Sequence, residues 1–203
     1  TLPSGSALVL AGAGSGKTRV LTTRVAWLLA SGRATPMGIL AVTFTNKAAR
    51  EMTTRLSAML PFSPRGMWIG TFHGLAHRFL RAHWREAGLP QTFGILDMQD
   101  QLALIKRLLK SLAVSDEAFP PRELQRFINS NKDQALRAEA LAPHDAYHTK
   151  LTELYAAYDA QCNREGVVDF AELMLRSYEL LQRGQLLREH YQQQPSLDVL
   201  EAL

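Results

Sequence analysis

The sequence predicts an α/β domain built on a parallel sheet, followed by a second domain that is entirely helical. Short apolar runs alternate with helical periodicity over residues 1–88, a spacing that favours a parallel sheet flanked by helices, whereas helical patterns dominate from residue 97 onward. The charge divides at the same place. Residues 1–88 contain 11 Lys and Arg against 2 Asp and Glu, a net charge of +9, and residues 89–203 contain 12 against 17, a net charge of −5. We therefore expect the first domain to face a polyanion.

Composition excludes several classes of protein. With 46% hydrophobic and 21% charged residues, the chain of 203 residues is not a wholly disordered one. Its single cysteine, Cys162, excludes an intramolecular disulfide and indicates a reducing, cytoplasmic setting. No run approaches the roughly 18 apolar residues that span a bilayer, so we expect no membrane partner. The chain starts at Thr1 without an initiator methionine, which indicates a fragment or a processed protein.

Strands and helices are expected to alternate in the first domain. Asn46 is a plausible N-cap for the second helix, and Gly32 ends the first. The strands are expected at residues 6–11, 39–45 and 67–72, and the helices at residues 17–30, 47–59 and 73–87.

The second domain should contain helices alone, because no strand pattern follows residue 96. Asp97 caps the first of these helices and Pro120-Pro121 opens the second. The helices are expected at residues 97–112, from 121 onward, at 145–165 and at 169–183. Near the end of the chain, Asp198 and Glu201 are expected on a short amphipathic helix capped by Ser196.

A glycine-rich segment between the first strand and the first helix has the pattern of a phosphate-binding loop. Its glycines let backbone N–H groups turn toward a phosphate, and the helix N-terminus adds positive potential. Lys17 can reach the β- and γ-phosphates, and the Thr18 hydroxyl can coordinate Mg²⁺, so ATP with Mg²⁺ is the expected ligand. The loop consists of Ala11, Gly12, Ala13, Gly14, Ser15 and Gly16. A chance glycine-rich turn is the alternative.

Two further motifs follow the second and third expected strands, at the ends where parallel sheets bind ligands. Each offers hydroxyl groups, one aromatic ring and a polar or basic group, which suits phosphate contacts and base stacking on single-stranded nucleic acid. From the spacing alone, an equally good interpretation makes Phe44 and Phe72 core residues and the hydroxyls simple caps. The residues of the motifs are Phe44, Thr45 and Asn46, and Thr71, Phe72 and His73.

The segments AGAGSGKT, TFTNKAAREM, GTFHGLAHRFLR and VVDFAELMLRSYELL occur in this order, and the chain resembles the UvrD/Rep/PcrA family over residues 1–193. The family comprises bacterial superfamily 1A DNA helicases that move 3′ to 5′ on single-stranded DNA. The resemblance implies a P-loop (RecA-like) motor domain 1A, partial, at residues 1–88, an inserted helical domain 1B at 89–193, and a tail of uncertain origin at 194–203. It also implies Arg19 near the base or sugar, with Phe44, Thr45 and Asn46, then Thr71, Phe72 and His73, contacting DNA.

Asp169, Phe170, Glu172 and Leu173 match the family's acidic-aromatic segment, but Asp169 is also explained as the cap of a helix whose Phe170 and Leu173 lie in the core. Other candidates are weaker. His73 and His77 are spaced like metal ligands with His83 nearby, yet no acidic or cysteine ligand accompanies them. We expect Cys162 to be unreactive and Trp27, Trp68 and Trp84 to be core residues. The spacing of Arg78, Arg81 and Arg85 fits equally a solvated face or a DNA contact.

The resemblance also shows what is missing. Family members continue into a strand that ends in Asp-Glu and have a second motor domain with an arginine for the γ-phosphate, and this sequence has no adjacent acidic pair near its end. We expect the chain to hydrolyse ATP poorly alone. A non-catalytic DNA- or protein-binding module and another P-loop phosphotransferase are the alternatives. Partners would be single-stranded DNA, a junction of single- and double-stranded DNA, and repair or replication proteins, in a bacterial cytoplasm. The sequence does not fix the oligomeric state.

Overall fold

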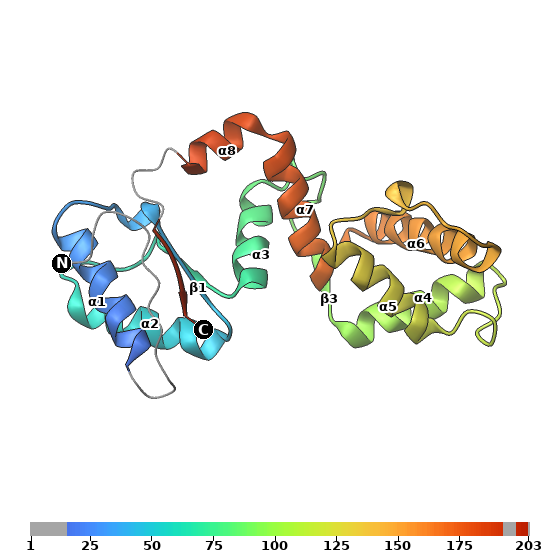
Figure 1. The fold of residues 1–203 in the computed structure, drawn as a ribbon, viewed down its shortest axis with the longest axis horizontal. Coiled ribbons are helices and arrows are strands. Elements are labelled where there is room, and N and C mark those ends of the chain that lie inside the picture. Colours follow the sequence, from blue (N-terminus) through green and yellow to red (C-terminus); the bar gives the residue numbers. More distant parts are fainter. Residues whose placement is uncertain (1–15, 193–197, 203) are drawn as a thin grey trace. The chain divides into compact units, whose positions relative to one another are not determined.

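A computed structural model describes residues 16–192 and 198–202 of the chain, and these form two compact units (Figure 1). The first unit takes in the described residues up to 75 and from 186 onward. The second unit takes in residues 76–185. The strand predicted at residues 6–11 and most of the phosphate loop lie outside the described residues.

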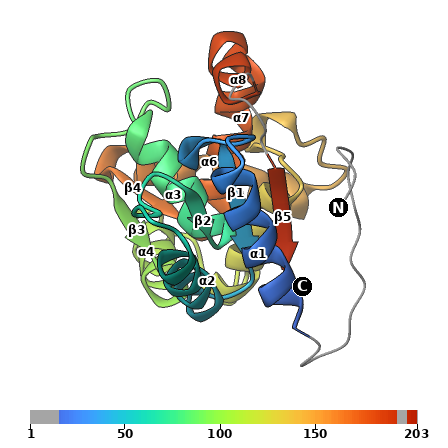
Figure 2. The same cartoon turned by 90° about the vertical axis from the view of Figure 1, so that its left-hand side faces the viewer.

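The first unit contains a parallel sheet in the order β2-β1-β5 (Figure 2). Its register pairs Val42 with Gly70 and with Glu201, so the carboxyl ends of the three strands share one edge. The strands are β1 (Ile39–Thr43), β2 (Trp68–Gly70) and β5 (Asp198–Ala202). The helices are α1 (Lys17–Ala30), η1 (Pro36–Gly38), α2 (Asn46–Met59) and α8 (Gln185–Gln192), and α3 (Phe72–Ala82) begins in this unit and continues into the second.

Residues of α1, β1 and α2 share one hydrophobic core, because each element places an apolar stripe toward the others. Val20 also lies on α1 but is 44% exposed. The core includes Val25, Leu28, Leu29, Ile39, Ala41, Met52, Leu56 and Met67.

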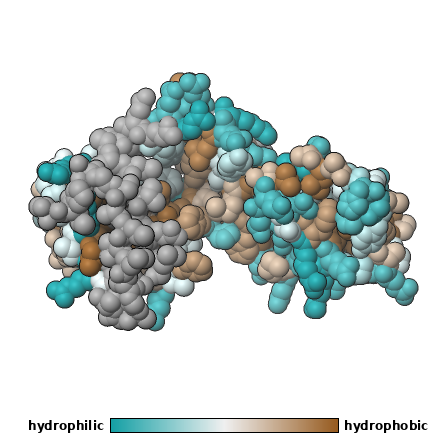
Figure 3. Space-filling model, in the orientation of Figure 1, coloured by the Kyte–Doolittle hydropathy of each residue, from teal (hydrophilic) through white to brown (hydrophobic). Residues whose placement is uncertain are grey.

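The second unit is a helical bundle with a small parallel sheet at its base. Strand β3 (Gly94–Leu96) pairs with β4 (Val167–Asp169), and the register sets Leu96 beside Asp169. On the face that Figure 3 shows, hydrophilic and hydrophobic residues are interspersed over this unit. The helices are α4 (Met98–Ser111), α5 (Pro121–Asp133), η2 (Ala138–Ala140), α6 (Ala146–Glu165) and α7 (Phe170–Arg183). Their shared core includes Leu104, Ile105, Leu109, Leu124, Ile128, Leu154, Tyr155 and Tyr158.

Two predictions of local structure are wrong in the same way. Asp198 and Glu201 lie on strand β5, not on an amphipathic helix, and β4 interrupts the segment predicted to be entirely helical. Both strands form by pairing with distant partners, β5 with β1 and β4 with β3. Local periodicity in the sequence carries no information on such long-range pairs.

The helix boundaries otherwise follow the sequence closely. Asp97, Asp145 and Asp169 cap α4, α6 and α7 with their carboxylates, and α5 starts at the second of two prolines. The cap of α2 is Thr45, one residue before the predicted Asn46, and α3 ends at Ala82. In the parts of the chain that the structure describes, no helix is long and apolar enough to cross a membrane.

Candidate nucleic-acid and nucleotide interface

Strands β1 and β2 each lead through a threonine into a helix, and the two turns have the same hydrogen bonds. The Thr45 hydroxyl oxygen accepts from the N–H of Ala48 at 3.1 Å, and the Thr71 hydroxyl oxygen accepts from the N–H of Gly74 at 3.2 Å. In both turns the threonine carbonyl also accepts from the residue four positions on. Each hydroxyl is used as an acceptor, which leaves its own proton for a ligand. Because β1 and β2 pair in parallel, the two turns lie at one edge of the sheet.

The phenylalanine beside each threonine is exposed. Phe44 has 79% of its surface accessible and Phe72 has 48%. The interpretation of both rings as core residues is therefore wrong. An exposed ring at the carboxyl edge of a parallel sheet has a free face on which a base can stack.

Small residues and a buried hydroxyl shape these turns. A Cβ at Gly74 would meet the Thr71 hydroxyl at 3.2 Å, and a Cβ at Gly70 would meet the Leu75 side chain at 3.3 Å. Glycine therefore lets the chain fold closely over the start of α3. In the β1 turn, the buried Thr43 hydroxyl donates to the carbonyl of Thr45 at 3.0 Å and fixes the backbone beside Phe44.

The start of α1 carries the described part of the phosphate-loop motif. Gly16 caps the helix at φ +88°, a left-handed conformation that favours glycine, and its carbonyl accepts from the N–H groups of Arg19 and Val20. Thr18 is half-buried and Arg19 is exposed. The residues present at this helix start fit a phosphate ligand, because the first N–H groups of a helix have no partner within it.

The first turns of α1, α2 and α3 contain no acidic side chain. An acidic residue near a helix N-terminus is stabilising, so its absence from three helices leaves the positive end of each dipole uncompensated by a neighbouring carboxylate. Asn46 and Lys47 at the start of α2 are exposed, as is His73 in α3. The starts of α2 and α3 therefore combine exposed polar side chains with helix dipoles that no acidic residue of their own first turns compensates.

His77 of α3 is engaged by a neighbouring arginine. The Nε2 atom of His77 accepts from Nε of Arg81 at 3.0 Å, and burial together with this guanidinium lowers the pKa of His77. Among the described residues, the three-residue group suited to a metal is a different one, His144, Asp145 and His148.

Arg81 has a structural task that its spacing did not reveal. Its guanidinium donates to the carbonyls of Gln91 and Phe93 at 2.6 and 2.8 Å and lies 4.2 Å from the centre of the Phe93 ring. Arg81 therefore ties α3 to the loop before β3. Neither of the two interpretations of its spacing included this structural role.

Among the other residues that the sequence singled out, the expectation for Cys162 is confirmed and that for Trp27 is wrong. Cys162 is buried, and burial raises the pKa of its thiol to about 12, which makes it unreactive. Trp68 and Trp84 are half-buried, but Trp27 is 37% exposed and lies between the guanidinium groups of Arg24 and Arg33, at 4.9 and 4.7 Å. For Trp27 the core prediction is wrong.

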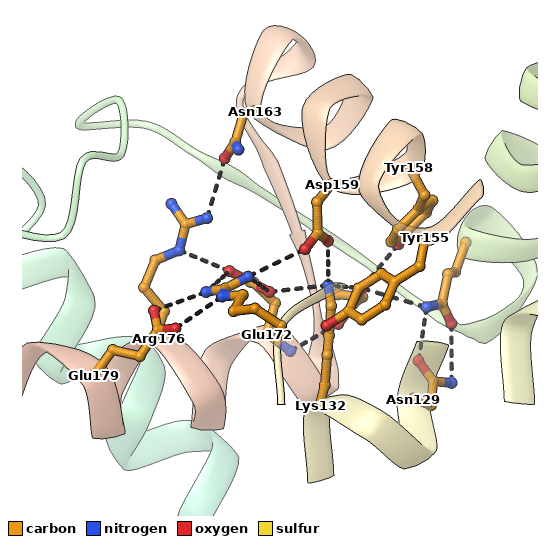
Figure 4. A network of polar contacts seen from close by, with 12 residues as sticks. Asn129, Lys132, Tyr155, Tyr158, Asp159, Asn163, Glu172, Arg176 and Glu179 are labelled. Atoms are coloured by element: carbon orange, nitrogen blue, oxygen red, sulfur yellow. Dashed lines mark hydrogen bonds and ion pairs between the residues drawn. The ribbon is translucent and has the colours of Figure 1, made fainter. Parts of the chain in front are cut away.

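Asp169 caps α7, as one of its two interpretations predicts, and it also anchors a buried polar network (Figure 4). Its Oδ1 accepts from the N–H of Glu172 at 2.7 Å. Its Oδ2 accepts from the Lys132 ammonium at 2.9 Å, from the Tyr158 hydroxyl at 2.8 Å and from the Gln101 amide at 3.3 Å. Leu173 lies in the core, whereas Phe170 is 41% exposed, contrary to expectation.

Lys132 occupies the centre of this network. Its ammonium lies 2.9 Å from a carboxylate oxygen of each of Asp159, Asp169 and Glu172, so its three N–H donors meet three acceptors. The Lys132 side chain is only 1% exposed. The three carboxylates raise its pKa against the opposing effect of burial. A lysine buried this deeply keeps its charge only because of these partners.

Glu172 is the second centre of the network. It accepts from Arg137 through two hydrogen bonds of 2.8 and 2.9 Å and from Arg176 at 2.8 Å. Burial opposes its ionisation, but Lys132, Arg137 and Arg176 together hold the pKa of Glu172 at about 2. Every buried side-chain polar atom among the described residues has a hydrogen-bond partner. The network joins α5, α6, β4 and α7. The sequence singled out its residues Asp169 and Glu172 but not the cations that hold them.

The fold and the site together define a class: a parallel α/β unit with ligand-accessible helix starts at its carboxyl edge, joined to a helical bundle. The model of the UvrD/REP helicase N-terminal domain matches residues 1–197, and the chain belongs to this family.

Curated relatives share the family. DNA helicase II of Escherichia coli (strain K12) is 49% identical over 192 residues, which cover 94% of this chain and 27% of that protein. The corresponding protein of Haemophilus influenzae is 50% identical over 196 residues, with coverage of 94% and 27%. ATP-dependent DNA helicase PcrA of Bacillus subtilis is 38% identical over 190 residues, with coverage of 93% and 26%. The chain spans about a quarter of the length of these relatives.

Proposed function

We propose that the chain is the ATP-binding and single-stranded-DNA-binding portion of a 3′–5′ DNA helicase motor. The observation that carries the proposal is the pair of exposed rings, Phe44 and Phe72, beside two threonine-capped helix starts on one edge of the sheet. Base stacking on exposed rings and phosphate contacts from hydroxyls and helix N-termini are how proteins hold single strands without sequence preference.

At this edge each turn would supply the same two contacts. The ring of Phe44 or Phe72 would stack on a base, and the hydroxyl of Thr45 or Thr71 would donate its proton to a phosphate oxygen while still accepting from the helix. Asn46 and His73 would add polar contacts to the backbone. The repeat of one pattern on neighbouring parallel strands suits a ligand that is itself a repeating chain.

The start of α1 would hold the triphosphate. The loop from Ala11 to Gly16 would turn its N–H groups toward the β-phosphate, and Lys17 would contact the β- and γ-phosphates. Thr18 would take one coordination position of Mg²⁺, and Arg19 would lie near the base or sugar. The left-handed Gly16 at the head of α1 supports this arrangement, because it opens the helix start to a ligand. Bound Mg²⁺ would neutralise charge on the phosphates.

The spacing of the carboxylates near the end of the chain supports the expectation that the chain alone hydrolyses ATP weakly. Strand β5 lies beside β1, but its acidic residues Asp198 and Glu201 are three positions apart, so they do not form an adjacent pair that could hold Mg²⁺ and orient water. This observation also favours the second candidate function, a DNA-binding module without catalytic turnover. DNA-stimulated ATP hydrolysis at a rate typical of kinases and helicases would exclude that candidate.

The remaining assignments rest on the family. Residues 1–88 would belong to a RecA-like motor domain 1A and residues 89–193 to an inserted domain 1B that approaches the junction of single- and double-stranded DNA. Residues 194–203 would form the tail. The parent protein would serve DNA repair or replication in a bacterial cytoplasm. The relatives are bacterial proteins named as DNA helicases.

The DNA contact is tested by the affinity for a fluorescent oligonucleotide. Replacing Phe44 or Phe72 by alanine should weaken binding by about 1–3 kcal/mol if the ring stacks on a base. Phe62→Ala is the matched control, because Phe62 is an exposed phenylalanine of the same unit, 41% accessible, in the segment between α2 and β2. Binding should also fall steeply with added salt. Equal affinities for the three variants would contradict the proposal.

The nucleotide contact is tested separately by ATP affinity with and without Mg²⁺. Lys17→Ala should weaken ATP binding strongly and leave the single-strand affinity measured without nucleotide unchanged. An ATP affinity that Lys17→Ala leaves intact would remove the nucleotide site from the proposal.

A further inference from the structure

A group of metal-binding side chains lies at the start of α6, in the second unit. His144, Asp145 and His148 each offer one ligand atom, and these atoms all lie within 4.8 Å of one another. Asp145 is the N-cap of α6, and one helical turn brings His148 back beside it. We propose that these three residues bind a divalent transition-metal ion of the Zn²⁺ class.

Both oxygens of the Asp145 carboxylate lie near Nδ1 of His148, Oδ1 at 2.9 Å and Oδ2 at 2.8 Å. Oδ1 also accepts from the backbone N–H of His148 at 2.7 Å, which fixes the carboxylate as a cap. Oδ2 lies 3.6 Å from Nε2 of His144. Zinc bonds of about 2.0–2.1 Å in a tetrahedron place neighbouring ligand atoms about 3.3 Å apart. The observed separations lie on either side of that value, so small side-chain rotations complete the site.

Neighbouring rings restrict the ligands. The His144 and His148 rings lie 4.6 Å apart at 30°, and the Tyr147 ring meets His148 edge-on at 5.8 Å. Tyr147 in turn stacks on Phe119 at 5.1 Å and 9°. The first turn of α6 is thus held against the segment before α5. Ligands restrained in this way lose less conformational entropy when they bind an ion.

The donor set selects the ion. Two imidazole nitrogens and one carboxylate oxygen suit zinc, nickel and copper, whereas Mg²⁺ and Ca²⁺ prefer oxygen ligands alone. The Asp145 carboxylate also offsets the positive end of the α6 dipole, because it is the N-cap of that helix. The three side chains are 78%, 47% and 41% exposed for His144, Asp145 and His148. A fourth coordination position therefore opens to solvent and would hold water.

Calorimetric titration of the 203-residue chain with Zn²⁺, in the absence of nucleotide, tests the proposal. We expect one site per chain, with affinity at least about tenfold weaker in His144→Ala and in His148→Ala. Excess Mg²⁺ should not displace the zinc. His190→Ala, which removes an exposed histidine of the first unit, is the control and should leave the affinity unchanged.

Asp145→Asn separates coordination from capping. Asparagine caps helices about as well as aspartate, so thermal stability without metal should stay the same while zinc affinity falls. Absence of zinc binding by the unmodified chain would overturn the proposal, as would affinities that both histidine variants leave unchanged. Single-strand DNA affinity plays no part in these outcomes, so the metal site and the proposed function can fail independently.

Discussion

In both units, parallel strands lead directly into helices with capped N-termini. The two units differ in the side chain that forms the cap. In the first unit, parallel strands β1 and β2 lead to helices capped by Thr45 and Thr71. In the second, parallel strands β3 and β4 lead to helices capped by Asp97 and Asp169. A carboxylate cap fills the anion position at a helix start with the protein's own charge, whereas a hydroxyl cap leaves that position for a ligand.

The difference extends beyond the caps. Helices α4 to α7 each have an acidic residue at the cap or in the first turn, and α1 to α3 have none in their first turns. The second unit also satisfies its buried charges internally, around Lys132 and Glu172. The buried charges of the second unit are thus paired within the unit, whereas the helix starts of the first unit suit the anionic ligands that we propose for it.

The largest expected effect is in the second unit. Lys132→Met leaves three buried carboxylates without their shared cation and should lower the free energy of unfolding by about 3–5 kcal/mol. Trp84 lies in this unit, so its fluorescence in a Trp27→Phe, Trp68→Phe background reports unfolding there. If the second unit of this variant fails to fold, the loss of stability is larger still and also agrees with the prediction.

Arg107→Met is the matched control for that variant. Arg107 pairs with Glu165 at 3.6 Å but its side chain is 70% exposed, so the loss should be at most about 1 kcal/mol. Equal losses in the two variants would contradict the claim that buried network charges hold the second unit together.

Acid should weaken the second unit in a defined window. Neighbouring cations lower the pKa of Glu172 from 4.5 to about 2, so its contribution to stability is complete above pH 4.5 and is lost as the pH falls toward 2. Burial raises the pKa of Asp159, which acts in the opposite direction and reduces the net slope. Urea unfolding followed by Trp84 fluorescence from pH 7 to pH 3 should show stability falling below pH 4.5. Stability that rises over this window would show that Asp159 dominates.

The smallest stability effect concerns the caps of the first unit. Thr45→Ala or Thr71→Ala should lower the free energy of unfolding by about 1 kcal/mol, because each removes one helix cap. Thr→Ser at the same positions keeps the hydroxyl and should restore both stability and single-strand affinity. Urea unfolding followed by Trp68 fluorescence, in a Trp27→Phe, Trp84→Phe background, measures the first effect, since Trp68 lies in β2. A serine variant as unstable as the alanine variant would show that the threonine methyl group, and not the cap, matters.

Local signals in the sequence predicted local structure well. Asp97, Asp145 and Asp169 mark helix starts because capping depends on residues within one turn. Strand β5 was mistaken for a helix because its partner β1 lies more than 150 residues away along the chain. Pairing of this kind leaves no local mark.

The buried network was missed for a related reason. Lys132 lies on an amphipathic helix whose polar face, read from the sequence alone, resembles a solvated one, and its partner Asp169 is 37 positions away. Spacing also left Phe44 and Phe72 undecided between the core and the surface. Their exposure depends on how the strands end and on what covers them, which only the folded chain shows.

The central claim is that the threonine caps of the first unit leave room for phosphates that the aspartate caps of the second unit exclude. The direct test replaces both threonine caps by aspartate in the double variant Thr45→Asp, Thr71→Asp. Its affinity for single-stranded DNA and its free energy of unfolding are both measured. Aspartate keeps both helices capped, so stability should match that of the unmodified chain, while two new carboxylates should abolish single-strand binding. Unchanged single-strand affinity in a stably folded double variant would contradict the account.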